Sequence, residues 1–199
     1  MKTSPQKTRT TKKMEDIEDA LRRSLSPVIP HIPKETNASA AVMILLVKNL
    51  EKWNIVYTRR TNDVRTHQGE VSFPGGVYEQ GDNSLVQTAL RETREEIGID
   101  PSCVKILGAM NPYITHYGLE IHPFVGILTC KADFNINESE VKRIFLVPVD
   151  WLKTDGNPHE QEYVVNEQVR RQVIHYEDYD GEHVWGITAR ITHDLLENI

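Results

Sequence analysis

The chain has 199 residues, of which 39% are hydrophobic and 26% are charged, and both fractions are ordinary for a globular domain. Its formal net charge of −6 argues against a broad nucleic-acid-binding surface, and no stretch approaches the ~20 consecutive apolar residues of a membrane helix. We therefore expect one folded domain with small-molecule partners and with neither nucleic acid nor a membrane among its partners.

The N-terminal 13 residues are strongly basic, with five Lys or Arg side chains and no acid. We expect a disordered basic tail over residues 1–13, because it contains almost no apolar side chain to bury. The segment lacks the apolar centre of a secretory signal and has a weak, Thr-rich similarity to a transit peptide. We expect a cytoplasmic protein, with a mitochondrial location as the alternative.

An N-terminal helix and a linker precede the main domain. Residues 14–25 predict an amphipathic helix, because apolar side chains recur at helical spacing: Ile17, Leu21 and Leu25. Three prolines between positions 27 and 33 then predict an extended segment. We expect the helix and its Pro-rich linker to occupy residues 14–36 and the folded domain to occupy residues 37–199.

Strands dominate the rest of the chain. Runs of apolar and β-branched residues predict strands at residues 40–47, 54–58, 104–110, 119–130, 145–149, 172–176 and 183–186. A helix is expected from Ser84, as N-cap, to about Ile97, and a second helix from Thr188, as N-cap, to Leu196. Strands mixed with few helices predict an α+β sandwich, in which helices flank a sheet.

Two segments lack a regular pattern. Residues 59–72 predict a loop. Residues 152–170 are irregular, which leaves open whether they form a substrate lid or a contact in a homodimer. The only two cysteines, Cys103 and Cys130, show no CxxC or zinc spacing, so we expect two reduced thiols in a reducing compartment.

The most informative segment is Arg91–Ile99, which reads RETREEIGI. On a helix, Glu92, Glu95 and Glu96 share one narrow sector. Carboxylates this close repel one another, and their oxygens suit a hard divalent cation such as Mg²⁺ or Mn²⁺. The alternative reading is a solvated acidic face. Gly98 is the expected C-cap of this helix.

Together with Gly76, this segment resembles the signature of the Nudix hydrolases, Gx5Ex7REUxEExGU, where U is a bulky apolar residue. The chain departs from the signature at Asp82, where Glu is usual, at Thr93, where an apolar residue is usual, and by one extra residue before Arg91. The resemblance implies a Nudix-type α/β/α sandwich with a mixed sheet. It also implies hydrolysis of a nucleoside diphosphate linked to another group.

The segment 57–76 resembles the additional motif of the coenzyme A pyrophosphatase branch, LLTxRSxxxRxHxGxxxFPGG. This implies cleavage of coenzyme A or its derivatives to adenosine 3′,5′-bisphosphate and a 4′-phosphopantetheine product. Within the motif, Arg59, Arg65 and His67 are expected to bind substrate phosphates, and loop-anchoring salt bridges are the alternative. Among aromatic residues, Tyr113 and Tyr117 are candidates to stack on the adenine, whereas Trp185 is expected in the core.

The resemblance also implies roles for the acidic residues. The expected ligands of Mg²⁺ or Mn²⁺ each offer a carboxylate or carbonyl oxygen: Gly76, Glu92, Glu95 and Glu96. Glu92 is expected as ligand or base, and Arg91 is expected to orient the glutamates. The candidate for the general base that activates water is Glu140, before the strand predicted at 145–149, with Glu120 and Glu70 as weaker candidates; for each of the three, the alternative is a surface glutamate without a catalytic role.

Two alternatives remain open at this stage. The first is a Nudix pyrophosphatase acting on another nucleotide, such as ADP-ribose, NADH, a dinucleoside polyphosphate or an oxidised dNTP. The second is a Nudix-fold binding module without catalysis. The crowded acids Glu92, Glu95 and Glu96 argue against the second, because a binding module has no need of them.

Overall fold

The computed structural model describes residues 17–29, 31–33, 38–61, 69–166, 169–197 and 199. The tail expected at residues 1–13 lies outside these ranges. Among the helices of the described residues, none is long and apolar enough to cross a membrane.

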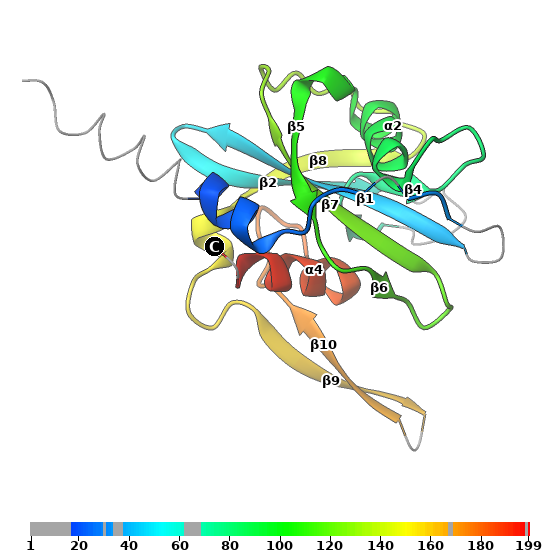
Figure 1. Ribbon diagram of the computed structural model, residues 1–199. Coiled ribbons are helices and arrows are strands. Elements are labelled where there is room, and N and C mark those ends of the chain that lie inside the picture. Colours follow the sequence, from blue (N-terminus) through cyan, green and yellow to red (C-terminus); the bar gives the residue numbers. More distant parts are fainter. Residues whose placement is uncertain (1–16, 30, 34–37, 62–68, 167–168, 198) are drawn as a thin grey trace, which may run out of the picture.

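A mixed sheet of eight strands forms the centre of the fold (Figure 1). The strands are β1 (Ser39–Asn49), β2 (Lys52–Arg60), β3 (Val71–Ser72), β4 (Gly75–Val77), β5 (Val104–Ala109), β6 (Tyr113–Ile114), β7 (Glu120–Leu128) and β8 (Val141–Pro148). Their main order is β3-β2-β1-β7-β5, with β4 on β1, β6 on β7 and β8 on β2. β1 and β7 are parallel, and the other pairs are antiparallel.

Helices cover the two faces of this sheet. α2 (Leu85–Ile97) packs on one face, and α4 (Gly186–Leu196) packs on the other together with the helix of residues 17–24 (Figure 1). Short helical turns, η1 (Pro101–Cys103) and α3 (Val149–Leu152), follow α2 and β8. These layers confirm the expected α+β sandwich with a mixed sheet.

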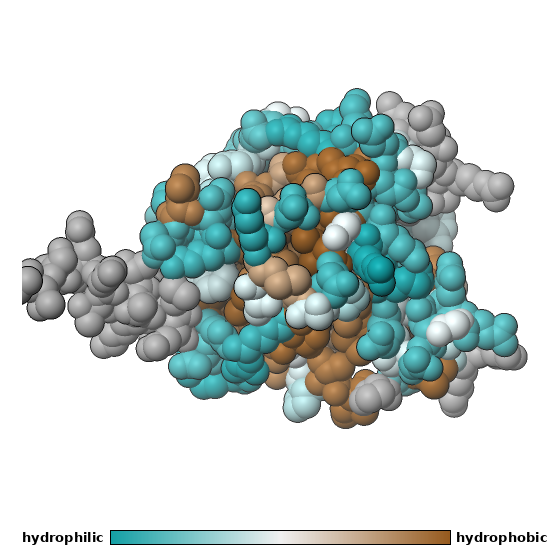
Figure 2. Space-filling model, turned by 90° about the horizontal axis from the view of Figure 1, so that it is seen from above, coloured by the Kyte–Doolittle hydropathy of each residue, from teal (hydrophilic) through white to brown (hydrophobic). Residues whose placement is uncertain are grey.

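Strand β1 shows why its sequence is continuously apolar. Met43 and Leu45 contact the core under α2, whereas Ile44 and Leu46 contact the core under α4, and all four are fully buried. Because side chains of a strand alternate between faces, a strand covered on both sides needs apolar residues at every position. Seen from above the view of Figure 1, hydrophobic residues run from the middle of the surface to its lower edge, with hydrophilic residues above and to either side (Figure 2).

Two segments that lack a regular sequence pattern contain strands. β2 and β3 extend into the loop predicted at 59–72, of which residues 62–68 are not described. Residues 152–170 contain β9 (His159–Asn166), which pairs with β10 (Val169–His175) in a hairpin that projects from the sandwich (Figure 1). The side chains of residues 159–164 are exposed, so this strand shows no apolar pattern from which it could be predicted.

The predicted start of the last helix is also wrong. α4 begins at Gly186, and Trp185 is its N-cap, so residues 183–186 do not form the predicted strand. Thr188 lies inside the helix, where its hydroxyl donates to the carbonyl of Val71 at 3.0 Å and fastens α4 to β3. Trp185 was expected in the core but is 41% exposed.

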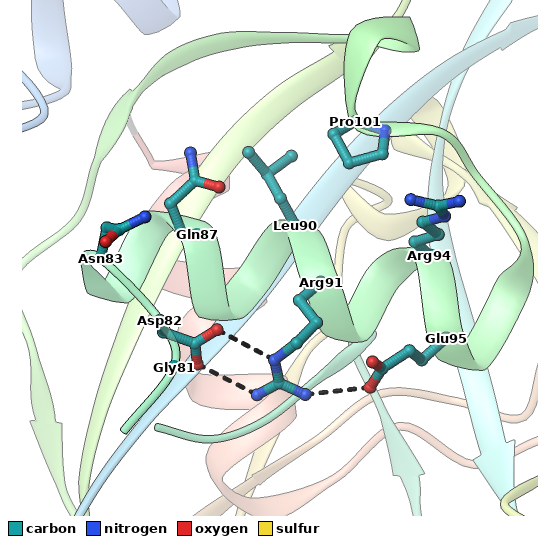
Figure 3. Close-up of a pocket in the computed structure, with 9 residues that line it drawn as sticks. All are labelled: Gly81, Asp82, Asn83, Gln87, Leu90, Arg91, Arg94, Glu95 and Pro101. Atoms are coloured by element: carbon teal, nitrogen blue, oxygen red, sulfur yellow. Dashed lines mark hydrogen bonds and ion pairs between the residues drawn. The ribbon is translucent and has the colours of Figure 1, made fainter. Parts of the chain in front are cut away.

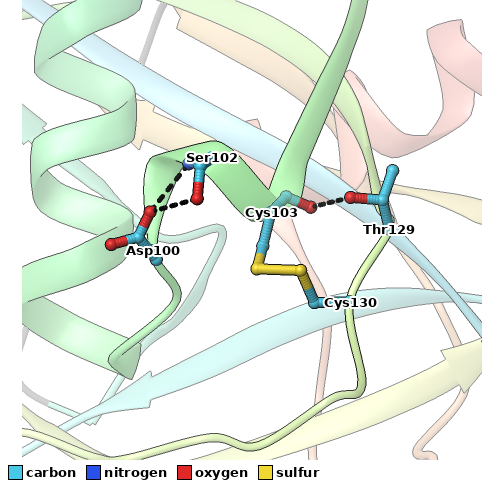
Figure 4. Close-up of a disulfide and its surroundings, with 5 residues drawn as sticks. All are labelled: Asp100, Ser102, Cys103, Thr129 and Cys130. Atoms are coloured by element: carbon cyan, nitrogen blue, oxygen red, sulfur yellow. Dashed lines mark hydrogen bonds between the residues drawn. A yellow bond between two sulfur atoms is a disulfide. The ribbon is translucent and has the colours of Figure 1, made fainter.

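The expectation of two reduced thiols is wrong, because Cys103 and Cys130 form a disulfide (Figure 4). Cys103 precedes β5 and Cys130 follows β7, and these strands pair with Val104 opposite Leu128. The strand register therefore brings the two cysteines to the same end of the sheet. A separation of 27 residues gives no local signal of this pairing.

Reduction of the disulfide is expected to lower the free energy of unfolding by about 3 to 4 kcal/mol, since the bond joins cysteines that are 27 positions apart in the chain. Urea unfolding with and without dithiothreitol measures this change. The double variant Cys103→Ala/Cys130→Ala is the control and should unfold at the midpoint of the reduced protein in either condition. An equal urea midpoint of the wild type with and without dithiothreitol would contradict the prediction.

Candidate metal-dependent active site

Helix α2 presents its acidic residues in a fixed frame. It begins after Ser84, whose side chain makes no capping hydrogen bond, and it ends at Gly98. Gly98 has φ 75°, and its N–H donates to the carbonyl of Arg94, so the predicted C-cap is confirmed. Thr93, which takes an apolar place in the signature, is fully buried and donates its hydroxyl to the carbonyl of Ala89 at 2.6 Å.

The Gly75–Gly76 pair lets β4 approach the glutamates of α2. The N–H of Gly75 donates to Oε2 of Glu96 at 3.2 Å. A Cβ atom on Gly76 would lie 2.2 Å from Oε1 of Glu92, so a side chain there would displace the Glu92 carboxylate, and a Cβ atom on Gly75 would lie 2.4 Å from the carbonyl oxygen of Ala41, where the backbone leaves no room for one. The structure therefore brings together Gly76, Glu92 and Glu96, as the signature implies.

The three glutamates of the helix differ in their burial. The side chain of Glu96 is 2% exposed, that of Glu92 is 13% exposed, and that of Glu95 is 53% exposed. Burial raises the pKa of Glu96 to about 8; the Gly75 N–H and Arg60 act in the opposite direction, and the charges of Glu92 and Glu140 add to the rise. Burial also raises the pKa of Glu92, against the opposing charge of Arg91.

Arg91 joins the acidic residues to the preceding loop (Figure 3). Its guanidinium contacts Asp82 through Nε at 3.0 Å and Nη2 at 3.1 Å, and Nη1 lies 2.9 Å from both Glu92 and Glu95. Asp82, which stands where the signature usually has Glu, therefore holds Arg91 in place. Burial alone would raise the pKa of Asp82, but hydrogen bonds from Arg91, the Glu79 N–H and Thr88 outweigh it and lower this pKa.

A cavity of about 480 Å³ opens beside the outer side of α2 (Figure 3). Its lining residues are Gly81, Asp82, Asn83, Gln87, Leu90, Arg91, Arg94, Glu95 and Pro101. Neither Glu92 nor Glu96 lines it. The two buried glutamates lie instead against β4, and Glu95, which lines the cavity, shares Nη1 of Arg91 with Glu92.

Arg60 and Glu140 complete the surroundings of Glu96. Nη1 of Arg60 lies 3.5 Å from Oε1 of Glu96. Glu140 is half-buried, its charge raises the pKa of both Glu92 and Glu96, and its carbonyl accepts from the N–H of Thr61 at 3.0 Å. Sequence reasoning missed Arg60. Arg59 and Arg60 are consecutive residues of β2, and consecutive side chains of a strand point to opposite faces. This alternation was the signal that Arg60 could face the site if Arg59 does not.

Of the three residues predicted to bind phosphate, the structure describes Arg59 alone. Arg59 donates to Glu182 at 2.9 Å, and Arg143 donates to the same carboxylate at 3.2 Å. This matches the alternative reading of Arg59 as an anchoring residue, and its contact with substrate stays a prediction. Arg65 and His67 fall outside the described residues.

The donor set around α2 fits a hard divalent cation. The charge of Glu140 opposes the ionisation of both Glu92 and Glu96, the charge of Glu92 also opposes that of Glu96, and a dication would offset this repulsion. Among the described residues, the ligand atoms of His193, Asp194 and Glu197 also lie within 4.8 Å of one another. That group sits on the surface of α4 and is explained by its own ion pairs, such as His193 with Glu197 at 3.5 Å.

Comparison with known proteins identifies the family. A family model described as NUDIX domain matches residues 37–168. The chain belongs to the Nudix family. It is therefore a Nudix hydrolase, an enzyme acting on pyrophosphate bonds of nucleoside diphosphate derivatives. The Nudix match stops before β10 and α4, although buried Ala189 and Ile191 of α4 are part of the same core.

Two similar curated proteins are both named "Uncharacterized Nudix hydrolase NudL". The one from Pectobacterium atrosepticum is 33% identical over 169 residues, covering 84% of this chain and 85% of the relative. The one from Yersinia pestis (strain Pestoides F) is 32% identical over 169 residues, covering 85% and 83%.

Solved Nudix structures are more distant. A C. elegans Ap4A hydrolase binary complex has a TM-score of 0.49 and 17% identity, over 56% of this chain and 80% of that chain. The NUDIX domain of Shewanella oneidensis NrtR, complexed with ADP ribose, has a TM-score of 0.48 and 18% identity, over 60% and 79%.

Proposed function

We propose that this Nudix hydrolase cleaves the pyrophosphate bond of coenzyme A or a derivative with Mg²⁺ or Mn²⁺. The products are adenosine 3′,5′-bisphosphate and a 4′-phosphopantetheine product. The observation that carries the hydrolysis is the pair of buried carboxylates, Glu92 and Glu96, held against Gly75–Gly76. The motif at residues 57–76 supports the choice of coenzyme A.

The metal ligands in this proposal are the carboxylates of Glu92, Glu95 and Glu96 and the carbonyl of Gly76. A bound dication would neutralise pyrophosphate oxygens and lower the pKa of a water molecule. Arg91 restrains Glu92 and Glu95 through contacts of 2.9 Å, so the ligand oxygens are oriented before the cation arrives.

Glu140 is the proposed general base. In hydrolysis, the oxygen of water bonds to phosphorus, the bridging P–O bond breaks, and a base takes the proton of the water. Glu140 is half-buried beside Glu92 and Glu96 but belongs to the turn before β8, not to α2. It can therefore approach the reacting water from a different direction than the ligands of the helix.

Mass spectrometry of the products tests the proposal. Purified protein is incubated with coenzyme A and Mg²⁺ or Mn²⁺, beside ADP-ribose, NADH, a dinucleoside polyphosphate and 8-oxo-dGTP. Metal-dependent release of adenosine 3′,5′-bisphosphate, faster than any other reaction, is the expected result. Dephospho-coenzyme A is the matched control, because it has the same pyrophosphate without the 3′-phosphate. Turnover of another nucleotide alone would discard the coenzyme A assignment and keep the Nudix reaction.

A further inference from the structure

A short segment after β7 closes the C-terminal end of the acidic helix. The last carbonyls of a helix have no partner within it. Here the N–H of Asn135 donates to the carbonyl of Ile97, and the N–H of Asn137 donates to the carbonyl of Glu96, both at 3.0 Å. Asn137 is thereby tied to the backbone of the most buried glutamate of the site.

The side chain of Asn137 points to Glu140. Its Nδ2 donates to Oε1 of Glu140 at 3.3 Å. Its Oδ1 accepts from the N–H of Ser139 at 3.2 Å and from the Ser139 hydroxyl at 2.6 Å. The carbonyl of Asn137 accepts from the N–H groups of Glu140, at 3.0 Å, and Val141, at 2.9 Å. One residue therefore contacts Glu140 through both its backbone and its side chain.

We propose that Asn137 is a positioning residue, which holds the carboxylate of Glu140 in a fixed place relative to Glu96. This inference rests on the role of Glu140 in the proposed function. The Asn137 donor occupies Oε1 of Glu140, and no donor within the described part of the chain contacts Oε2, which can accept a proton from water. The backbone bond to Glu96 fixes the distance between this base and the metal-binding helix.

An asparagine suits this position for a chemical reason. Its amide offers a donor for Glu140 and an acceptor for Ser139 at the same time. Aspartate would keep the acceptor and the shape but would place a second negative charge against Glu140. Alanine would keep the backbone bonds to Glu96 and Glu140 and lose both side-chain contacts.

The test compares single variants with a matched control. Asn137→Ala and Asn137→Asp are expected to lower kcat about 10- to 100-fold with little change in KM, as when an orienting partner is lost. Ser139→Ala removes the hydroxyl contact to Asn137 and leaves the Asn137–Glu140 contact, so it should retain the wild-type kcat. The assay uses any nucleotide that the wild type hydrolyses, so failure on coenzyme A alone would not bear on Asn137.

A double variant separates positioning from a general structural role. Glu140→Gln is expected to lose about 10²- to 10⁴-fold in kcat as the base is removed. Asn137→Ala added to Glu140→Gln should then cost nothing further. The same loss in both backgrounds, or a wild-type rate in Glu140→Gln, would overturn the inference. Mn²⁺ affinity, measured by electron paramagnetic resonance, should match the wild type in Asn137→Ala; a parallel loss of Mn²⁺ binding would instead assign Asn137 to the metal site.

Discussion

Replacing Glu96 by glutamine is expected to lower kcat/KM about 10²- to 10⁴-fold, the equivalent of several kcal/mol of charge stabilisation at a metal site. Glutamine has the shape of glutamate, and its oxygen can still accept the hydrogen bond from the Gly75 N–H. It lacks the negative charge that would hold a dication between the helix and β4. The variant should therefore fold normally and hydrolyse poorly.

Steady-state kinetics with Mg²⁺ and thermal unfolding of the same sample check both halves of this prediction. Glu51→Gln is the matched control, since Glu51 is exposed in the β1–β2 turn and forms a local ion pair with Lys48. The control should keep the wild-type kcat/KM. Near-parental turnover in Glu96→Gln would remove Glu96 from the metal ligands.

The acidic helix could be predicted because its signals are local. Apolar and acidic residues separate at helical spacing over Leu85–Ile97, and Gly98 supplies the left-handed end. The same reasoning failed for β9, whose exposed residues at 159–164 carry no alternation, although it predicted most of β10 as a strand at 172–176. It also failed for the disulfide between Cys103 and Cys130, which depends on the register of β5 on β7.

Within the candidate site, the sequence predicts which residues lie together better than it predicts the surroundings of each. Glu92, Glu95 and Glu96 look equivalent in the sequence, yet their side-chain exposure ranges from 2% to 53%. This difference comes from β4 and Arg60, which are remote in the chain. The position of Asn137 is likewise non-local, because its contacts with Glu96 and Glu140 require the segment after β7 to return to α2.

Metal-free protein is expected to lose stability as the pH rises from about 4.5 towards 8. Burial raises the pKa of Glu96 from 4.5 to about 8, so the folded state holds a proton that the unfolded state releases. The stabilisation of the folded state by protonated Glu96 is fully present below pH 4.5 and is lost as the pH rises through the folded-state pKa. The whole change amounts to about 3 to 5 kcal/mol in the free energy of unfolding.

Urea unfolding in EDTA between pH 5 and 8.5 measures this change, with Glu96→Gln as the reference. Burial lowers the pKa of His122 and His175, which gives an opposite slope below 6.5 in both proteins, so the difference between the proteins is decisive. Glu96→Gln should become the more stable protein as the pH rises.

Saturating Mg²⁺ or Mn²⁺ should then stabilise the wild type far more than the variant, because a cation that binds only the folded state shifts unfolding by mass action. If the stability of the two proteins in EDTA changed with pH in the same way, the pKa of Glu96 would not be raised by folding. Glu96 would then be charged without metal, and the prediction would be wrong.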